Sequence, residues 1–271
     1  MQKIIKEINE EKGIVQITLP DERWYWKSVI DKTIPKATEV FVPSVTWITS
    51  FYPKGVAYFK WLANLGWNEA EAAKQAAADK GSKVHKAIVD LIDGKDIPMD
   101  AKYVNPSTEQ PEELTVEEWE ALMSFRDWFV LTKPQVLARE SVVFSDEYGY
   151  AGTIDIFCKI EGETWLIDFK TGQYIWPSSE LQVSAYKHAF EKPIDKLGIL
   201  QLGYRRNKNL FKLTEVEDQF SLFLAAKQIW AKETTGDAPV QKDLPLILSL
   251  KVEEKDEKVE SKKLITKKKS I

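Results

Sequence analysis

Cysteine is nearly absent from this 271-residue chain, whose single Cys158 has no partner for an internal disulfide. Apolar runs long enough to cross a bilayer, about 20 residues, are also absent. Residues 1–7 lack the apolar core of a signal peptide. We therefore expect a cytoplasmic protein that makes no membrane contact. Strand alternation predicts that Cys158 lies in the core, on the strand face opposite Asp155.

Several motifs that bind cofactors are missing as well. The sequence contains no glycine-rich phosphate loop, no cluster of cysteine and histidine residues and no nucleophile-elbow motif. We therefore expect no nucleotide cofactor and no ATP-driven motion within this chain. A metal-binding protein with some other substrate stays an alternative, but no motif in the sequence selects it.

Charge is unevenly distributed along the chain. The net charge is −4, but residues 251–271 contain eight lysines and five acidic residues, which leaves −7 for the rest. An acidic body does not favour nonspecific coating of duplex DNA, since a basic surface supplies most of that affinity. A local basic groove would still bind phosphates. We expect the tail to be a disordered, solubilising segment rather than a DNA-binding arm.

The most informative segment, residues 151–170, predicts a β-hairpin. Two short runs rich in apolar and β-branched residues lie on either side of Glu161-Gly162. If these two residues form the loop, the pairing that follows places Asp155 directly opposite Asp168.

Alternation along these strands predicts one charged face and one core face. Asp155, Asp168 and Lys170 share the charged face. Carboxylates about 5 Å apart destabilise a sheet unless a cation compensates, and their oxygens suit Mg²⁺ or Mn²⁺. Alternatively, the two aspartates are solvated and Lys170 is their ion-pair partner. The core face is predicted to carry Ile154, Ile156, Trp165, Ile167 and Phe169.

Further features stand around the hairpin. A glycine precedes Asp155 by three residues, a Gln-x-x-x-Tyr pair follows on a predicted helix, and a histidine lies on an earlier helix after a Gly-Ser step. They are Gly152, Gln182 with Tyr186, and Gly81-Ser-Lys-Val-His85. Together with the Asp-Phe-Lys triplet they resemble the PD-(D/E)XK nuclease superfamily, and specifically its RecB-like branch. Taken alone, the histidine is as readily a helix-surface residue, and the Gln–Tyr pair a packing pair.

The resemblance implies a role for each matched residue. Asp155 and Asp168 would be ligands of Mg²⁺ or Mn²⁺, with the backbone carbonyl of Phe169 as a further ligand. His85 would bind the same metal or a second one. Lys170 would be the catalytic lysine, which positions the attacking water or offsets charge in the transition state.

Other residues would support this site. Glu140, in a strand predicted over 137–144, matches an acidic position that many members carry. Gln182 and Tyr186 would buttress the site or contact the DNA backbone. An iron–sulfur cluster is not expected, because it needs four cysteine ligands. The chain is therefore similar to the cluster-free members, as found in phages and in mitochondrial genome maintenance.

Residues outside the motifs are candidates for DNA contacts. Tyr174 and Trp176 could stack unpaired bases, although packing of their loop is the simpler alternative. Arg205 and Arg206 at a strand end could hold phosphates, or remain solvated charges.

The order of predicted elements gives an α/β fold, a mixed central sheet flanked by helices, which matches the restriction-endonuclease-like core of this superfamily. We expect an N-terminal hairpin extension over 1–40, the nuclease domain over 41–235, and a C-terminal segment over 236–271 with the charged tail. Among the helices, one is predicted to open at Gly81 and end at Gly94, and another starts at a capping box, Thr115-x-x-Glu118.

The expected function is hydrolysis of DNA phosphodiester bonds in replication, recombination or repair, with DNA and a recombination or replication protein as partners. The resemblance favours an exonuclease. A structure-specific or nonspecific endonuclease is the alternative, and a catalytically silent DNA-binding scaffold is a third hypothesis.

Overall fold

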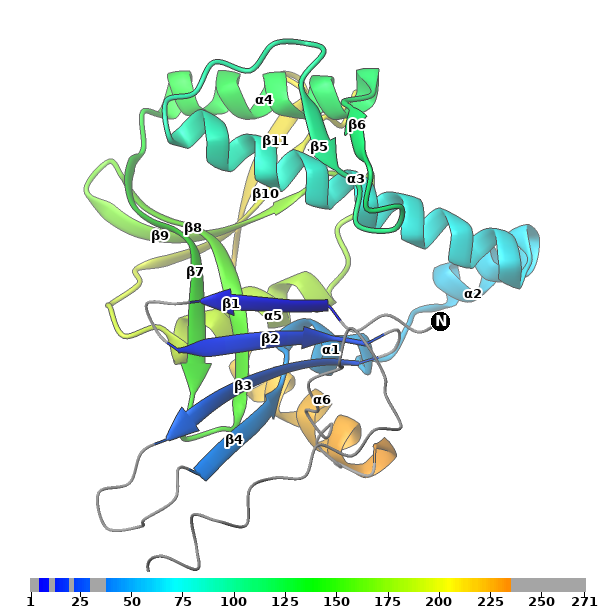
Figure 1. Ribbon diagram of the computed structural model, residues 1–271, viewed down its shortest axis with the longest axis vertical. Helices are drawn as coiled ribbons and strands as arrows, with labels where there is room; N and C mark the ends of the chain where they lie inside the picture. The colour runs from blue at the N-terminus through cyan, green and yellow to red at the C-terminus, as the bar shows by residue number, and fades with distance from the viewer. Residues whose placement is uncertain (1–4, 10–12, 20–21, 30–37, 235–271) are drawn as a thin grey trace, which may run out of the picture. The chain divides into compact units, whose positions relative to one another are not determined.

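The computed structural model describes residues 5–9, 13–19, 22–29 and 38–234, all within one unit of the chain (Figure 1). The charged tail expected within residues 236–271 lies outside the described residues, as do parts of the N-terminal extension. The division of the chain at residues 40 and 235 stays a prediction. No helix in the described ranges combines the length and apolar character needed to cross a bilayer.

A five-stranded mixed sheet forms the centre of the fold, in the order β11-β10-β9-β8-β7. The pair β9–β10 is parallel and the other neighbours are antiparallel. Helix α5 (Ser178–Ala189) links the parallel pair, because parallel strands need a crossover connection. The expected α/β class is therefore confirmed. The strands are β7 (Gln135–Ser145), β8 (Tyr150–Ile160), β9 (Glu163–Lys170), β10 (Lys196–Leu202) and β11 (Phe211–Val216).

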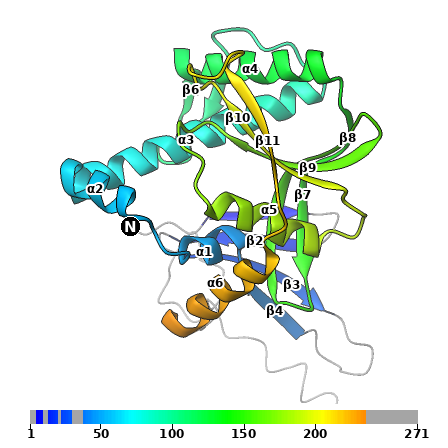
Figure 2. The same ribbon diagram turned by 180° about the vertical axis from the view of Figure 1, so that it is seen from behind.

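One face of this sheet is covered by α3 (Trp67–Ile92) and α4 (Val116–Thr132), as Figure 1 and Figure 2 show. The cluster beneath them contains Ile88, Phe125 and Ile167, together with the buried Cys158. The predicted capping box is confirmed, since the Thr115 side chain accepts from Glu118 N and the Glu118 side chain accepts from Thr115 N.

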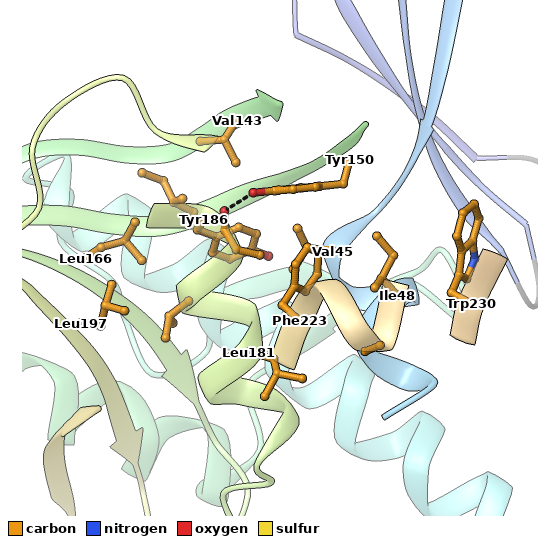
Figure 3. Packing of buried hydrophobic residues seen from close by; sticks show 14 of the residues in the cluster. Val45, Ile48, Val143, Tyr150, Leu166, Leu181, Tyr186, Leu197, Phe223 and Trp230 are labelled. Carbon is orange, nitrogen blue, oxygen red and sulfur yellow. Dashed lines mark hydrogen bonds between the residues drawn. The ribbon is translucent and has the colours of Figure 1, made fainter. Parts of the chain in front are cut away.

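The opposite face packs against α1 (Val45–Ser50), α5 and α6 (Phe220–Glu233). Figure 3 shows this cluster, in which Tyr150 OH donates a 2.9 Å hydrogen bond to Ala185 O. The prediction that this side of β8 and β9 would be a charged face is wrong: Phe157 and Leu166 are buried in it. Ile154 also joins this cluster rather than that of Ile156, so the alternation of β8 is interrupted at Asp155.

A second sheet lies at the N-terminal side of the chain. It is an antiparallel meander in the order β1-β2-β3-β4, so two further strands follow the first hairpin. Strands β3 and β4 contact β8, and Tyr25, Val42, Val142 and Ala151 form the cluster between them. The strands are β1 (Ile5–Asn9), β2 (Ile14–Thr18), β3 (Arg23–Val29) and β4 (Thr38–Pro43).

The central hairpin has the predicted turn and register. Glu161 and Gly162 both have positive φ, 50° and 95°, as a two-residue type I′ loop requires, and Ile160 pairs with Glu163. However, the ladder ends one pair early, at Ile156–Ile167. The expected direct pairing of Asp155 with Asp168 is therefore wrong, because the two strands separate before it.

Helix α3 is continuous where a break was expected. Gly81 lies in its interior rather than at its start. A glycine there costs about 1 kcal/mol relative to alanine, and buried contacts on either side, at Ala70 and Val84, hold the helix together. The predicted end is confirmed: Gly94 has φ +77° just after the last turn. The loop that follows contains the short pair β5 (Lys102–Val104) and β6 (Pro111–Glu113).

Candidate active site

Asp155 occupies the point at which β8 and β9 separate. Its Oδ2 accepts a 2.6 Å hydrogen bond from the backbone N–H of Phe169, so a side chain takes the place of a main-chain acceptor. The strands diverge around this carboxylate, which is 10% exposed. The hydrogen bond from Phe169 therefore fixes the Asp155 carboxylate between the separating strands.

His85 reaches the same point from α3. Its Nδ1 lies 3.3 Å from Asp155 Oδ1 and its Nε2 lies 3.2 Å from the carbonyl oxygen of Phe169. Burial lowers the pKa of His85, but the nearby charges of Asp155, Glu140 and Asp168 outweigh burial and raise it to about 9. The imidazole thus sits between two oxygen atoms, one from each of the separating strands.

Glu140 on β7 completes a group of three donors. One ligand atom each from His85, Glu140 and Asp155 lies within 4.8 Å of the other two. Glu140 has φ +43°, a left-handed conformation that costs a non-glycine residue roughly 1–2 kcal/mol. Such strain is concentrated at functional sites. Here it accompanies the placement of an acidic residue beside Asp155.

Asp168 is the most buried acid of the group, at 2% exposure. Its Oδ2 lies 2.6 Å from Lys170 Nζ but accepts no well-directed hydrogen bond. Its Oδ1 accepts from Gln182 Nε2 at 2.8 Å. Burial raises the pKa of Asp168 to about 6, against the opposing charge of Lys170.

Gln182 on α5 connects the acid, the lysine and Tyr186. Its amide nitrogen also donates to Tyr186 OH at 3.0 Å, and its oxygen accepts from Lys170 Nζ at 3.2 Å. The ring of Tyr186 packs against Gly152, where a Cβ atom would lie 2.4 Å from Tyr186 Cε1. The glycine, glutamine and tyrosine of the sequence pattern therefore form one contact network beneath Asp168.

The N-terminal sheet supplies a neighbour that was not foreseen. Tyr25 OH lies 3.1 Å from Thr153 Oγ1 and donates to Gln16 Oε1 at 2.6 Å. The aromatic run of residues 24–26 was the only sequence signal. No role could be assigned to that run from the sequence, and it gave no indication of a contact 128 positions along the chain.

Three other predicted site residues, Tyr174, Trp176 and Arg205, contact neighbours outside the group of Asp155, Asp168 and Glu140. Tyr174 and Trp176 contact each other in the loop after β9, with ring centroids 4.7 Å apart. Arg205 forms a two-pronged pair with Glu120 of α4, at 2.9 and 3.1 Å. A phosphate would have to compete with that carboxylate for the guanidinium.

The donor set fits a hard divalent cation. Carboxylate oxygens predominate, as Mg²⁺ and Mn²⁺ require, with one histidine nitrogen among them. His85, Glu140 and Asp155 could hold such an ion, and the Phe169 carbonyl oxygen lies beside His85. Asp168 is not in this group of three, but it is near enough for its charge to raise the pKa of His85.

No family model and no curated protein matches this chain. Among solved structures, an alkaline exonuclease (LHK-Exo) from Laribacter hongkongensis is similar at 9% identity and TM-score 0.36, over 70% of this chain and 84% of that one. Another, SSO0001, is similar at 11% identity and TM-score 0.32, over 48% of this chain and 62% of that one. At these values neither likeness assigns a fold or an activity to the chain.

Proposed function

We propose that this protein is a metal-dependent deoxyribonuclease of the PD-(D/E)XK type. The observation that carries the proposal is the Asp168 carboxylate, which is buried between Lys170 and Gln182 close to a second acid, Asp155. Burying a charged carboxylate is costly unless a cation or hydrogen bonds compensate. Lys170 is the ion-pair partner of Asp168, and the neighbouring acids Asp155 and Glu140 add further negative charge, so the arrangement suits a site that binds a further cation.

The ligands would be Asp155, Asp168, Glu140, His85 and the carbonyl oxygen of Phe169. A divalent cation held there would supply a nucleophilic water at neutral pH and offset charge on a phosphate. The nitrogen of His85 favours Mn²⁺ over Mg²⁺, since imidazole binds the transition metal more readily.

Lys170 would act directly on the reacting atoms, and Gln182 would position it. The Lys170 ammonium donates hydrogen bonds and carries positive charge, so it would orient the attacking water and stabilise the phosphate oxygens. The oxygen of water would attack phosphorus while its proton passes to solvent, and the bond to the leaving sugar oxygen would break on the opposite side, that oxygen taking a proton from solvent. Gln182 holds Lys170 and Asp168 in one orientation throughout.

The resemblance of the sequence pattern to RecB-like members without a helicase or a cluster supports exonucleolytic action. Replication, recombination or repair would be its setting. Cleavage inside a strand is the alternative, and the two differ in their need for a DNA end.

The test is degradation of end-labelled linear and circular DNA, single- and double-stranded, with Mg²⁺, Mn²⁺ or EDTA. Asp168→Asn is compared with Asp127→Asn, which removes an exposed carboxylate on α4. We expect loss of linear substrate with metal only, and only Asp168→Asn to abolish it. Cutting of circles would indicate an endonuclease. DNA binding without cleavage under any metal would contradict the proposal and favour the scaffold.

A further inference from the structure

Helix α2 (Val56–Leu65) is apolar, and in the described part of the chain it packs along α3 and the loop after β9, with none of its residues buried. All its residues except Lys60 and Asn64 are apolar, and none of them is buried. The rings of Phe59 and Trp61 are 56% and 37% exposed. Figure 1 and Figure 2 show α2 and the first half of α3 extending beyond the five-stranded sheet. Exposed apolar surface of this kind marks a binding site.

The rings of α2 continue into the loop that follows β9. Tyr58 contacts Phe59, Trp61 and Trp176, with centroids 5.6, 5.7 and 5.9 Å apart, and Trp176 contacts Tyr174. These five rings, Tyr58, Phe59, Trp61, Tyr174 and Trp176, are called the aromatic surface below. An edge-to-face contact, as between Tyr58 and Trp176 (79°), covers one face of one ring, so the pair itself leaves the other ring faces uncovered.

The loop end of this surface is tied to the candidate active site. Tyr174 follows Lys170 by four residues. Gln201 on β10 donates hydrogen bonds to the carbonyl oxygens of Gly172 and Gln173, at 2.8 and 3.1 Å. The loop is thus held to the sheet, and the aromatic surface begins four residues along the chain from the lysine proposed to act on phosphate.

Positive charge accompanies the aromatic rings. Burial lowers the pKa of Lys54, and the nearby charge of Lys74 lowers it further. Lys74 itself pairs with Glu71 at 2.5 Å and interacts with Tyr58. Within the described part of the chain, Lys54 and Lys60 form no ion pair with an acidic residue. Two lysines are therefore available to an anion next to the rings.

We propose that the aromatic surface binds unpaired bases of a DNA strand while Lys54 and Lys60 bind its phosphates. Successive bases stack on aromatic rings regardless of sequence, and lysines follow the backbone. A phosphate backbone would pair with Lys54 and Lys60, whereas an apolar protein surface that covers the rings would not require them. The inference rests on the proposed function and adds the substrate class: the site is supplied with single-stranded or frayed ends.

The test measures binding separately from cleavage. A fluorescent oligothymidylate is titrated with full-length protein in EDTA, and its anisotropy is followed. Phe59→Ser and Tyr174→Ala remove exposed rings, and Val130→Ser on α4, 65% exposed, is the matched control. We expect each aromatic variant to bind about fivefold or more weakly and the control to bind as wild type. An abasic oligomer of equal length should lose the same affinity.

Equal binding by wild type and the aromatic variants, or equal binding of the abasic strand, would overturn the inference while leaving cleavage intact. A dimer in light scattering that Phe59→Ser dissociates would also overturn it, because a second copy would then cover the surface. Ring-dependent binding without cleavage in Mn²⁺ would support the inference and contradict the proposed function.

Discussion

The ring of Tyr186 fills the space that a side chain on Gly152 would occupy: a Cβ atom there would lie 2.4 Å from Tyr186 Cε1. The hydroxyl of the same tyrosine accepts from Gln182, which in turn donates to Asp168. A glycine three residues before Asp155 is thus explained by close packing beneath the proposed site, since its φ is not in the left-handed region.

Gly152→Ala should displace Tyr186 and, through it, Gln182. Overpacking of this kind costs roughly 1–3 kcal/mol, and we expect that loss in urea unfolding together with weaker cleavage. Gly81→Ala is the matched control, because its new methyl group meets only Thr171 Oγ1, at 3.8 Å. Inside α3 it should stabilise the fold by about 0.5–1 kcal/mol. Equal stability of wild type and Gly152→Ala would contradict the packing argument.

Gln182→Leu should reduce cleavage without unfolding the protein. The substitution keeps an apolar side chain of similar size but removes the donor to Asp168 and the acceptor for Lys170. Mutating a residue that orients a metal ligand typically lowers metal affinity or activity 10–100-fold. We therefore expect Gln182→Leu to reduce cleavage by about that factor. Tyr186→Phe, which removes only the hydroxyl, should lose less. The measurement is kcat and metal affinity for both variants, and a larger effect of Tyr186→Phe would refute this ordering.

Glu140 has a strained backbone and is also a proposed metal ligand. Two substitutions separate these two properties. Glu140→Gly and Glu140→Gln both remove the charge beside His85 and Asp155, so both should weaken Mn²⁺ binding in calorimetry. Only glycine relieves the strain at φ +43°. Glu140→Gly should therefore be more stable than Glu140→Gln, by up to about 1 kcal/mol. The reverse order of stability would show that the conformation is unstrained.

His85→Ala should discriminate between metal ions. The variant loses the one nitrogen donor of the group and keeps its oxygen donors. Because imidazole contributes more to Mn²⁺ than to Mg²⁺, Mn²⁺ affinity should fall by a larger factor than Mg²⁺ affinity. Thermal unfolding with each ion reports this independently of activity, since a ligand stabilises the native state according to its affinity. Unchanged Mn²⁺ affinity would remove His85 from the proposed ligands.

The sequence predicted the local features of the fold well. The Glu161-Gly162 turn, the hairpin register and the Thr115–Glu118 capping box all depend on neighbours within a few residues. Alternation also predicted that Asp168 and Lys170 share a strand face, and the family resemblance implied that Gln182 supports them; the structure places the three in contact. Turn chemistry and alternation are strong signals at this range.

Errors arose where distant contacts decide the conformation. The strands separate at Asp155 because its carboxylate accepts from Phe169 N, a competition that alternation does not reveal. Gly81 stays helical because of tertiary packing along α3. Alternation likewise gave no sign that Arg205 pairs with Glu120, 85 positions away; a phosphate contact of Arg205 stays a prediction. Alternation also could not show that helices cover both faces of the sheet.

The central claim is that Lys170 acts on a phosphodiester at a metal site built around Asp155 and Asp168. The most direct measurement is the single-turnover rate of nucleotide release from linear single-stranded DNA in Mn²⁺. It compares wild type with Lys170→Met and with the control Lys159→Met, an exposed lysine of the same hairpin. The account predicts a loss of about 100-fold or more for Lys170→Met alone, with Mn²⁺ binding retained. Wild-type rates for Lys170→Met, or cleavage that persists in EDTA, would contradict it.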